Sequence, residues 1–385
     1  MRYTSTNDVW FGRTHGGITY NGTTQLILDN GTIEGGSAKF AFPHALANSS
    51  NNSKNVVVKL LMQNGSSIST TADIHFGEVE RANSKTEKTL QITAAVTNSS
   101  MTAKAVRFGQ TNSYISDLDN SFVNASFGPG SDVSCYQFYA FQYPKATVTF
   151  DGTTVHWLGG DQNVFGKNSG AVNFEGYRLL SGGVTFDVPQ NLTHGSLFGA
   201  LVGEGGFTKT GSGTLTYERD AFLFTGPLTV SNGVMISSQN MAASAFAVDG
   251  ASSELRLSGA LTNANVTLSA TAGGTLTLSG ATLPDASPDL TLADGAALGF
   301  NFTERTAAPV LSAASATLSG TVNVKVFAAD GIRPKSGAYT LTSGGAFADA
   351  VVSLVDAPYW VEALSLEDGN IVLSVKHPGL SIFIK

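Results

Sequence analysis

Residues 203–236 read GEGGFTKTGSGTLTYERDAFLFTGPLTVSNGVMI and contain the pattern that decides the fold. Short segments of strand-forming residues alternate with turns that contain glycine, such as Gly211-Ser212-Gly213 and Asn232-Gly233. Glycine and Asn-Gly adopt positive φ at low steric cost, so each of these pairs is a plausible corner of the chain. The segments between the corners are too short for an ordinary hairpin sheet with a core of its own.

The same pattern repeats toward the C-terminus. A first series of apolar residues in strand-like triplets recurs every 20 to 23 residues, at Leu215, Met235, Leu255, Leu276, Leu298, Leu318 and Leu341. A second strand falls between these anchors, at 228–230, 246–248, 266–268 and 290–292. A fixed period of about 20 residues with no helical pattern is typical of a solenoid, here a parallel β-helix whose coils stack about 4.8 Å apart.

Two segments within the opening stretch resemble a known family. FTKTGSGTLT at 207–216 and FTGPLTVSNG at 224–233 are similar to the autotransporter-associated β-strand repeat, also called the passenger-associated transport repeat. In that pattern Leu stands where this chain has Phe207 and Tyr217, and Tyr stands where it has Phe224. The resemblance covers about one repeat, with weaker echoes to residue 320. It implies a right-handed β-helical passenger of a secreted or surface-displayed bacterial protein, and it brings no catalytic residues.

The fold class that we expect is therefore all-β: a right-handed parallel β-helix with a C-terminal antiparallel hairpin cap. The right hand is what the resemblance implies. We place the solenoid at 21–335, an N-terminal cap over its open end at 1–20, and the C-terminal β cap at 336–385. The hairpin is expected because two strand-like runs, 361–366 and 371–375, flank a turn of sequence Glu-Asp-Gly-Asn.

Composition restricts the function. Charged residues make up only 13% of the chain, against roughly 25% in a typical soluble domain, and the net charge is −7. An acidic chain lacks the basic footprint that nucleic acid or an anionic membrane requires, so we expect neither as a partner. We also expect no transmembrane segment, because no apolar run approaches 18 residues. The opening MRYTSTNDVW does not resemble a signal peptide, so the export signal is expected to lie outside this chain.

Aromatic residues are densest at 135–143, which read CYQFYAFQY. Strand alternation predicts one set of rings on one face and the second set on the other: Tyr139, Phe141 and Tyr143, then Tyr136 and Phe138. One interpretation is a platform that stacks on sugar rings, and these five residues are our candidate ligand-binding residues. The other is a structural ladder buried in the solenoid.

Residues that would carry catalysis are sparse in the sequence. Asp117 and Asp119 alternate onto one face and could begin a Ca²⁺ site, or they could cap a turn. The six histidines show no zinc-binding spacing, and neither a phosphate-binding loop nor a nucleophile elbow stands in a suitable context. Cys135, which is alone in the chain, is expected to be a buried apolar residue. We therefore expect no catalytic residue, no cofactor and no metal.

These observations lead to two hypotheses. The first is a non-catalytic, exported structural or adhesive β-helical module, located outside the cell or on the bacterial surface, whose partners are glycans or cell-surface molecules. The second is a carbohydrate-active β-helical enzyme, a polysaccharide lyase or hydrolase, with a site assembled from several coils. A convergent acidic cluster with a Lys or Arg in a groove would favour the enzyme, and a smooth neutral face would favour the module.

Overall fold

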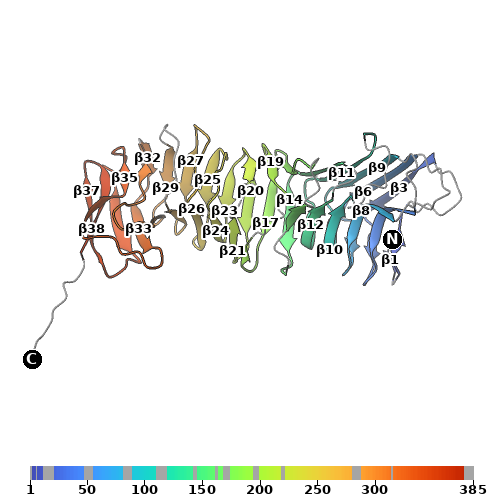
Figure 1. Ribbon diagram of the computed structural model, residues 1–385, viewed down its shortest axis with the longest axis horizontal. Coiled ribbons are helices and arrows are strands. Elements are labelled where there is room, and N and C mark those ends of the chain that lie inside the picture. Colours follow the sequence, from blue (N-terminus) through green and yellow to red (C-terminus); the bar gives the residue numbers. More distant parts are fainter. Residues whose placement is uncertain are drawn as a thin grey trace, which may run out of the picture. The chain divides into compact units, whose positions relative to one another are not determined.

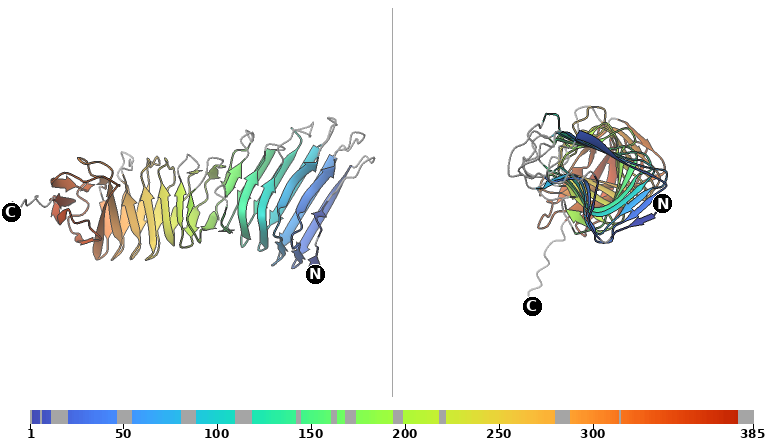
Figure 2. Two further views of the ribbon diagram at one scale, coloured as in Figure 1. Left: turned by 60° about the horizontal axis from the view of Figure 1, so that its bottom comes forward. Right: turned by 90° about the vertical axis from the view of Figure 1, so that its right-hand side faces the viewer.

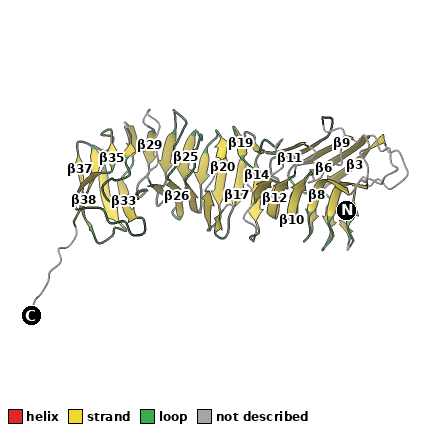
Figure 3. Ribbon diagram, viewed as in Figure 1, coloured by secondary structure: helices red, strands yellow, loops and turns green. Residues whose placement is uncertain are grey.

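The fold was analysed in a computed structural model of the full chain (Figure 1). The structure describes residues 2–5, 7–11, 21–46, 55–80, 89–109, 119–141, 145–160, 164–167, 174–193, 199–217, 222–279, 288–313 and 315–376. The chain divides into two compact units, unit 1 (Met1–Phe207) and unit 2 (Thr208–Lys385), and each is described by itself. The described residues form strands, turns and loops without any helix (Figure 3).

Unit 1 is built from two parallel sheets whose strands follow one another around each coil (Figure 2). The first sheet contains β1 (Arg2–Thr4), β2 (Val9–Trp10), β4 (Thr32–Glu34), β5 (Phe40–Leu46), β7 (Ser67–Ser69), β8 (Ile74–Glu80), β10 (Ser100–Phe108), β12 (Asp132–Ala140), β14 (Thr153–Trp157), β15 (Phe165–Lys167) and β17 (Val184–Asp187). The second contains β3 (Asn21–Asp29), β6 (Asn55–Gln63), β9 (Thr89–Val96), β11 (Phe122–Phe127), β13 (Lys145–Phe150), β16 (Tyr177–Leu179) and β19 (Leu201–Gly203). The short strand β18 (Leu192–Thr193) precedes β19 in the chain.

Unit 2 repeats this design with shorter coils. One parallel sheet contains β21 (Thr214–Tyr217), β24 (Gly233–Ser237), β26 (Ser253–Leu257), β28 (Thr275–Leu278), β30 (Ala297–Phe302), β33 (Thr321–Ala328) and β36 (Val351–Val355). A second contains β23 (Leu228–Val230), β25 (Ala245–Val248), β27 (Thr267–Ala270), β29 (Asp289–Leu292) and β32 (Ser315–Leu318). The remaining strands are β20 (Phe207–Thr210), β22 (Phe222–Phe224), β31 (Leu311–Ser312), β34 (Gly337–Thr340), β35 (Thr342–Ser343), β37 (Val361–Glu367) and β38 (Asn370–Val375).

Long parallel sheets of this kind confirm the predicted solenoid-like, all-β architecture. Successive strands pair in register, so inward apolar side chains stack on apolar side chains of the next coil, and most outward positions on β26 and β28 are polar. The first anchor series is confirmed for five positions, because Leu215, Met235, Leu255, Leu276 and Leu298 oppose one another in turn and are fully buried.

The anchor series is wrong from Leu318 onward. Val324, rather than Leu318, opposes Leu298 on β33, and Leu318 lies on the other sheet opposite Leu292. The distance along the chain from Leu298 to Val324 is 26 residues, so this coil is longer than the preceding ones. A fixed period therefore placed Leu318 on the wrong sheet. Leu341 is buried, but it precedes β35, which pairs with β31.

A stack of phenylalanine rings fills the core of unit 1. Neighbouring ring centroids are 4.7–6.3 Å apart along the series Phe11, Phe42, Phe76, Phe108, Phe138, Phe165, Phe186 and Phe207. The first six rings are near-parallel, with interplanar angles of 3–19°. Each contact adds about 0.5–1.5 kcal/mol beyond the burial of its apolar area. The stack is defined here as the phenylalanine ladder.

Parallel strand pairs are also present outside the predicted solenoid range of 21–335. β1 and β2, which lie within the predicted N-terminal cap, pair in parallel with β4 and β5 and so continue the ladder of coils. At the other end, β36 pairs in parallel with β33 and extends the ladder beyond residue 335.

The C-terminal hairpin is present as an antiparallel pair of β37 and β38, and β38 also pairs with β34. Glu367 opposes Asn370, which leaves a two-residue loop. Asp368 and Gly369 in that loop both have positive φ, at 49° and 71°, as a primed hairpin turn requires.

Candidate functional site

The predicted aromatic cluster is divided between the core and the surface. Tyr136 is 40% exposed, whereas Phe138 is fully buried in the phenylalanine ladder. We had expected these two rings on the same face, and that expectation was wrong. Tyr136 and Gln137 both point away from the core because β12 changes partner there, from β14 at Asp132–Cys135 to β15 at Phe138–Ala140.

Two other rings of the cluster are held by neighbouring side chains. The Phe141 ring lies 5.7 Å from the Arg107 guanidinium and stacks on the His75 imidazole at 5.8 Å. Tyr139 packs edge-on against Phe141, with centroids 4.9 Å apart. Tyr143 lies outside the described residues. Of the five candidates, Tyr136 is therefore the ring most available to a ligand, and Phe138 is structural.

Tyr136 lies in a polar groove on the outer face of unit 1. The groove has a volume of about 360 Å³ and is lined by Lys104, Ala105, Arg107, Tyr136, Gln137 and Gly160. We call it the Tyr136 groove. Gly160 lies beside the Tyr136 ring, and its φ of 85° suits glycine. The role of Lys104 and Arg107 in the groove was not predicted from the sequence, because both residues belong to the preceding coil.

The Tyr136 groove carries an excess of positive charge. Nε of Arg107 lies 2.7 Å from Oδ2 of Asp73, an ion pair without an aligned N–H···O hydrogen bond. Lys104 is exposed and forms no ion pair within the described ranges. Lys104 and Arg107 thus outnumber the carboxylate of Asp73 at the groove, although the chain as a whole has a net charge of −7. Such a groove favours a ligand with a negative charge.

A second cluster on the outer face of unit 1 holds a histidine between two carboxylates. His156 Nε2 lies 3.0 Å from Oδ2 of Asp132, and Nδ1 lies 3.0 Å from Oδ2 of Asp187. Burial by itself lowers the pKa of His156, but the hydrogen bonds and charges of Asp187 and Asp132 outweigh burial and raise it. Protonated His156 donates from both ring nitrogens, which leaves neither nitrogen as a base.

The remaining candidates of the sequence analysis do not form a site in the described part of the chain. Asp119 is exposed in the turn before β11, and Asp117 lies outside the described residues. Among the residues described, no three His, Cys, Asp or Glu side chains are arranged to hold a metal ion. Cys135 is fully buried, and burial raises the pKa of its thiol far above the usual range, so this thiol is an unreactive core residue.

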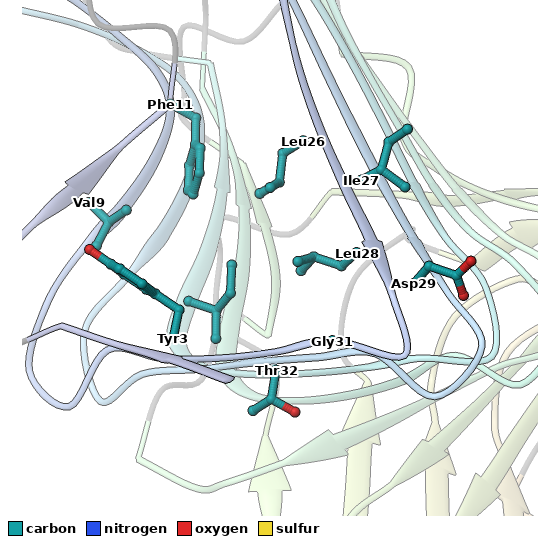
Figure 4. A pocket seen from close by; sticks show the side chains of 10 residues that line it. Tyr3, Val9, Phe11, Leu26, Ile27, Leu28, Asp29, Gly31 and Thr32 are labelled. Atoms are coloured by element: carbon teal, nitrogen blue, oxygen red, sulfur yellow. The ribbon is translucent and has the colours of Figure 1, made fainter. Parts of the chain in front are cut away.

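An apolar cavity of about 350 Å³ lies at the first coil of unit 1 (Figure 4). Leu26 and Leu28 point into it, whereas Ile27 and Asp29 point away. Phe11, the first ring of the phenylalanine ladder, also lines it. The cavity is therefore part of the apolar core at its N-terminal end.

Comparisons with protein-family models, with curated proteins and with solved structures found no match. Within the described ranges, no helix has the length and apolar character needed to cross a membrane.

Proposed function

We propose that this chain is a non-catalytic, exported or surface-displayed bacterial β-helical module that binds glycans carrying acidic groups. The observation that carries the proposal is the Tyr136 groove, where an exposed aromatic ring stands beside Lys104 and Arg107. An aromatic face packs on the C–H face of a sugar ring, and cationic side chains bind its carboxylate or sulfate. Gln137 adds an amide that can both donate and accept hydrogen bonds.

The resemblance to the autotransporter-associated repeat supports the finer parts of this proposal. It favours a right-handed coil, export from a bacterial cell and a role in presenting a long surface. We further propose that the hairpin of β37 and β38 caps the solenoid. Trp360 supports that role, because it is almost fully buried before β37 and packs edge-on against Phe302 of β30, with centroids 5.9 Å apart. A covered end would not recruit other strands.

The alternative function is a carbohydrate-active enzyme, and the cluster of Asp132, His156 and Asp187 is the observation in its favour. Carboxylates and a histidine are the side chains from which acid–base cleavage of a glycosidic bond is built. The geometry favours a structural role, because the two carboxylates engage both nitrogens of the imidazole and tie three successive coils together.

A single incubation distinguishes the two functions. The full chain is mixed with insoluble acidic and neutral polysaccharides, and both retained protein and released products are measured. We expect retention on the acidic polysaccharides, no new reducing ends and no unsaturated products. Tyr136→Ala should reduce retention, whereas Leu223→Ala, which removes another exposed apolar side chain, should not. Released products that disappear in His156→Gln would establish the enzyme instead.

A further inference from the structure

Unit 2 carries a second groove on the outer face of the sheet that contains β26, β28, β30 and β33. The groove has a volume of about 290 Å³, and the side chains that give it its chemistry are Arg256, Thr277, Ser279, Asn301, Phe327 and Asp330. Its volume is close to the lower limit, about 300 Å³, of small-molecule sites, which suits one sugar ring. We call it the Phe327 groove.

Gly299 of β30 leaves room for the side chains of the neighbouring strands. Arg256, Thr277, Gly299 and Lys325 occupy the same row on four successive strands. A Cβ at Gly299 would overlap the hydroxyl and methyl groups of Thr277. Lys325 reaches past Gly299 to Thr275, with Nζ 3.3 Å from Oγ1. The row therefore has no side chain on β30, and the Lys325 side chain crosses that position next to Thr277.

Arg256 is held in one orientation before any ligand arrives. Its Nε and Nη2 atoms donate to the two carboxylate oxygens of Glu254, each at 2.8 Å. The Thr277 hydroxyl donates to Glu254 Oε1 at 2.7 Å and fixes the carboxylate in turn. The guanidinium keeps further N–H groups at Nη1 and Nη2, because arginine has five donors and this pair uses two of them. Preorganised donors lose little entropy when they bind.

The other side chains supply a ring face and complementary polar groups. Phe327 opposes Asn301 across the ladder of β30 and β33, and both are half-buried. Asp330 offers acceptors and Arg256 offers donors, whereas Asn301 and Ser279 can both donate and accept. Hydroxyl groups each donate and accept, so a compact molecule rich in hydroxyls matches this mixture. Arg256 is paired with Glu254 and Lys325 with Asp356, and Asp330 adds a further carboxylate, so the surroundings of the groove disfavour an anion.

From this geometry we propose that the Phe327 groove binds one pyranose ring of a neutral glycan, with the ring stacked on Phe327. The site is independent of the Tyr136 groove, because its residues all lie in unit 2 and its charge balance is the opposite one. It would give the chain a second carbohydrate specificity.

The test measures binding of neutral trisaccharides to the full chain by saturation-transfer NMR and calorimetry, with maltotriose, cellotriose, mannotriose and galactotriose as probes. We expect at least one of them to bind. Phe327→Ala and Asn301→Ala should each weaken that binding by about tenfold or more, the scale of one lost ring contact or hydrogen bond. Phe327→Tyr, which keeps the ring, should stay within about threefold of the parent chain.

Tyr136→Ala is the matched control, because it removes the exposed ring of the other groove, and it should leave trisaccharide binding unchanged. Circular dichroism of each variant verifies that the fold is retained, and Asn301→Ala covers the case in which Phe327→Ala unfolds. The proposal is overturned if none of the four trisaccharides binds. It is equally overturned if binding survives Phe327→Ala and Asn301→Ala in folded protein, or if Tyr136→Ala removes it.

Discussion

Lys209 is a fully buried lysine whose ammonium group is held by backbone carbonyls. Nζ donates to the carbonyl oxygens of Thr210 at 3.0 Å, Gly211 at 2.7 Å and Asn232 at 2.8 Å. It therefore joins the turn after β20 to the turn one coil later. Lys209 lies within FTKTGSGTLT, one of the two segments that resemble the repeat, and these contacts give it a structural role in this chain.

We predict that Lys209→Met destabilises unit 2 by about 3 kcal/mol, since it removes three hydrogen bonds to backbone carbonyls, each of which contributes about 1 kcal/mol net. Urea unfolding followed by circular dichroism measures the effect. Lys335→Met, which replaces an exposed lysine of the same unit, is the control and should change stability by less than about 0.5 kcal/mol. Equal effects of the two substitutions would show that the carbonyl contacts contribute little.

His156 gives unit 1 a stability that depends on pH. Its pKa is raised in the folded state, so the stabilisation is fully present below its unfolded value of 6.5 and is lost as the pH rises through the higher folded value. We predict that His156→Gln lowers the free energy of unfolding by at most about 1 kcal/mol at pH 6, because the cluster is partly exposed. At pH 9 the substitution should have almost no effect.

Thermal unfolding of parent and variant at the two pH values measures this difference. Asp187→Asn removes one of the two carboxylates and should reproduce part of the loss at pH 6. A loss of the same size at pH 6 and pH 9 would mean that His156 contributes through packing alone.

At the scale of elements, the corners depend on residues that accept positive φ. Asn30, Asn64 and Asn98 occupy left-handed positions with φ of 50°, 57° and 44°, at the ends of β3, β6 and β9. The backbone N–H of Asn98 donates to the carbonyl oxygen of Pro129 at 2.9 Å, and the backbone carbonyl oxygen of Asn98 accepts from the N–H of Gly65 at 2.7 Å. Each corner is therefore hydrogen-bonded to the corners of the neighbouring coils.

We predict that Asn98→Val destabilises unit 1 by about 1–2 kcal/mol, the cost of a left-handed backbone for a residue with a β-branched side chain. Asn98→Gly should be neutral within about 0.5 kcal/mol, because glycine accepts this conformation. Chemical unfolding of both variants tests the prediction. If Asn98→Gly were as destabilising as Asn98→Val, the asparagine side chain rather than the backbone angle would be the source of stability.

The short-range parts of the fold were predictable from the sequence, and the irregular coils were not. Glycine and asparagine turns, in-register apolar triplets and the Asp368-Gly369 hairpin depend on neighbouring residues, so they appear as local patterns. Leu318 was misplaced because the coil after Leu298 is longer than its predecessors, and a period cannot reveal an insertion. A buried aromatic ladder was one interpretation of 135–143 and holds for Phe138, but the extent of the phenylalanine ladder was missed, since its rings are spaced unevenly along the chain.

The candidate site was only partly predictable for the same reason. Tyr136 stands out in an aromatic run, but its outward direction follows from the bend at which β12 changes partner. Lys104 and Arg107 reach the same groove from the previous coil, and the register that brings them there is a property of the folded chain. Phe327 and Asn301 meet in the same way, through the pairing of β30 with β33.

At the scale of the whole molecule, we expect the grooves of the two units to prefer ligands of different charge. The Tyr136 groove has two cations and one carboxylate, whereas around the Phe327 groove Arg256 and Lys325 are paired with Glu254 and Asp356, and Asp330 adds a third carboxylate. Binding at the first should therefore weaken as salt screens exposed charges, and binding at the second should depend little on salt.

The preference of the Tyr136 groove for acidic glycans is tested most directly with one polysaccharide in two charge states. Retention of the full chain is measured on insoluble polygalacturonate and on the same polymer after complete methyl esterification, for the parent chain and for Lys104→Gln. We predict stronger retention of the parent chain on the acidic form, and Lys104→Gln should remove most of the difference between the two forms. Equal retention of the parent chain on both forms, or an undiminished difference in Lys104→Gln, would contradict it.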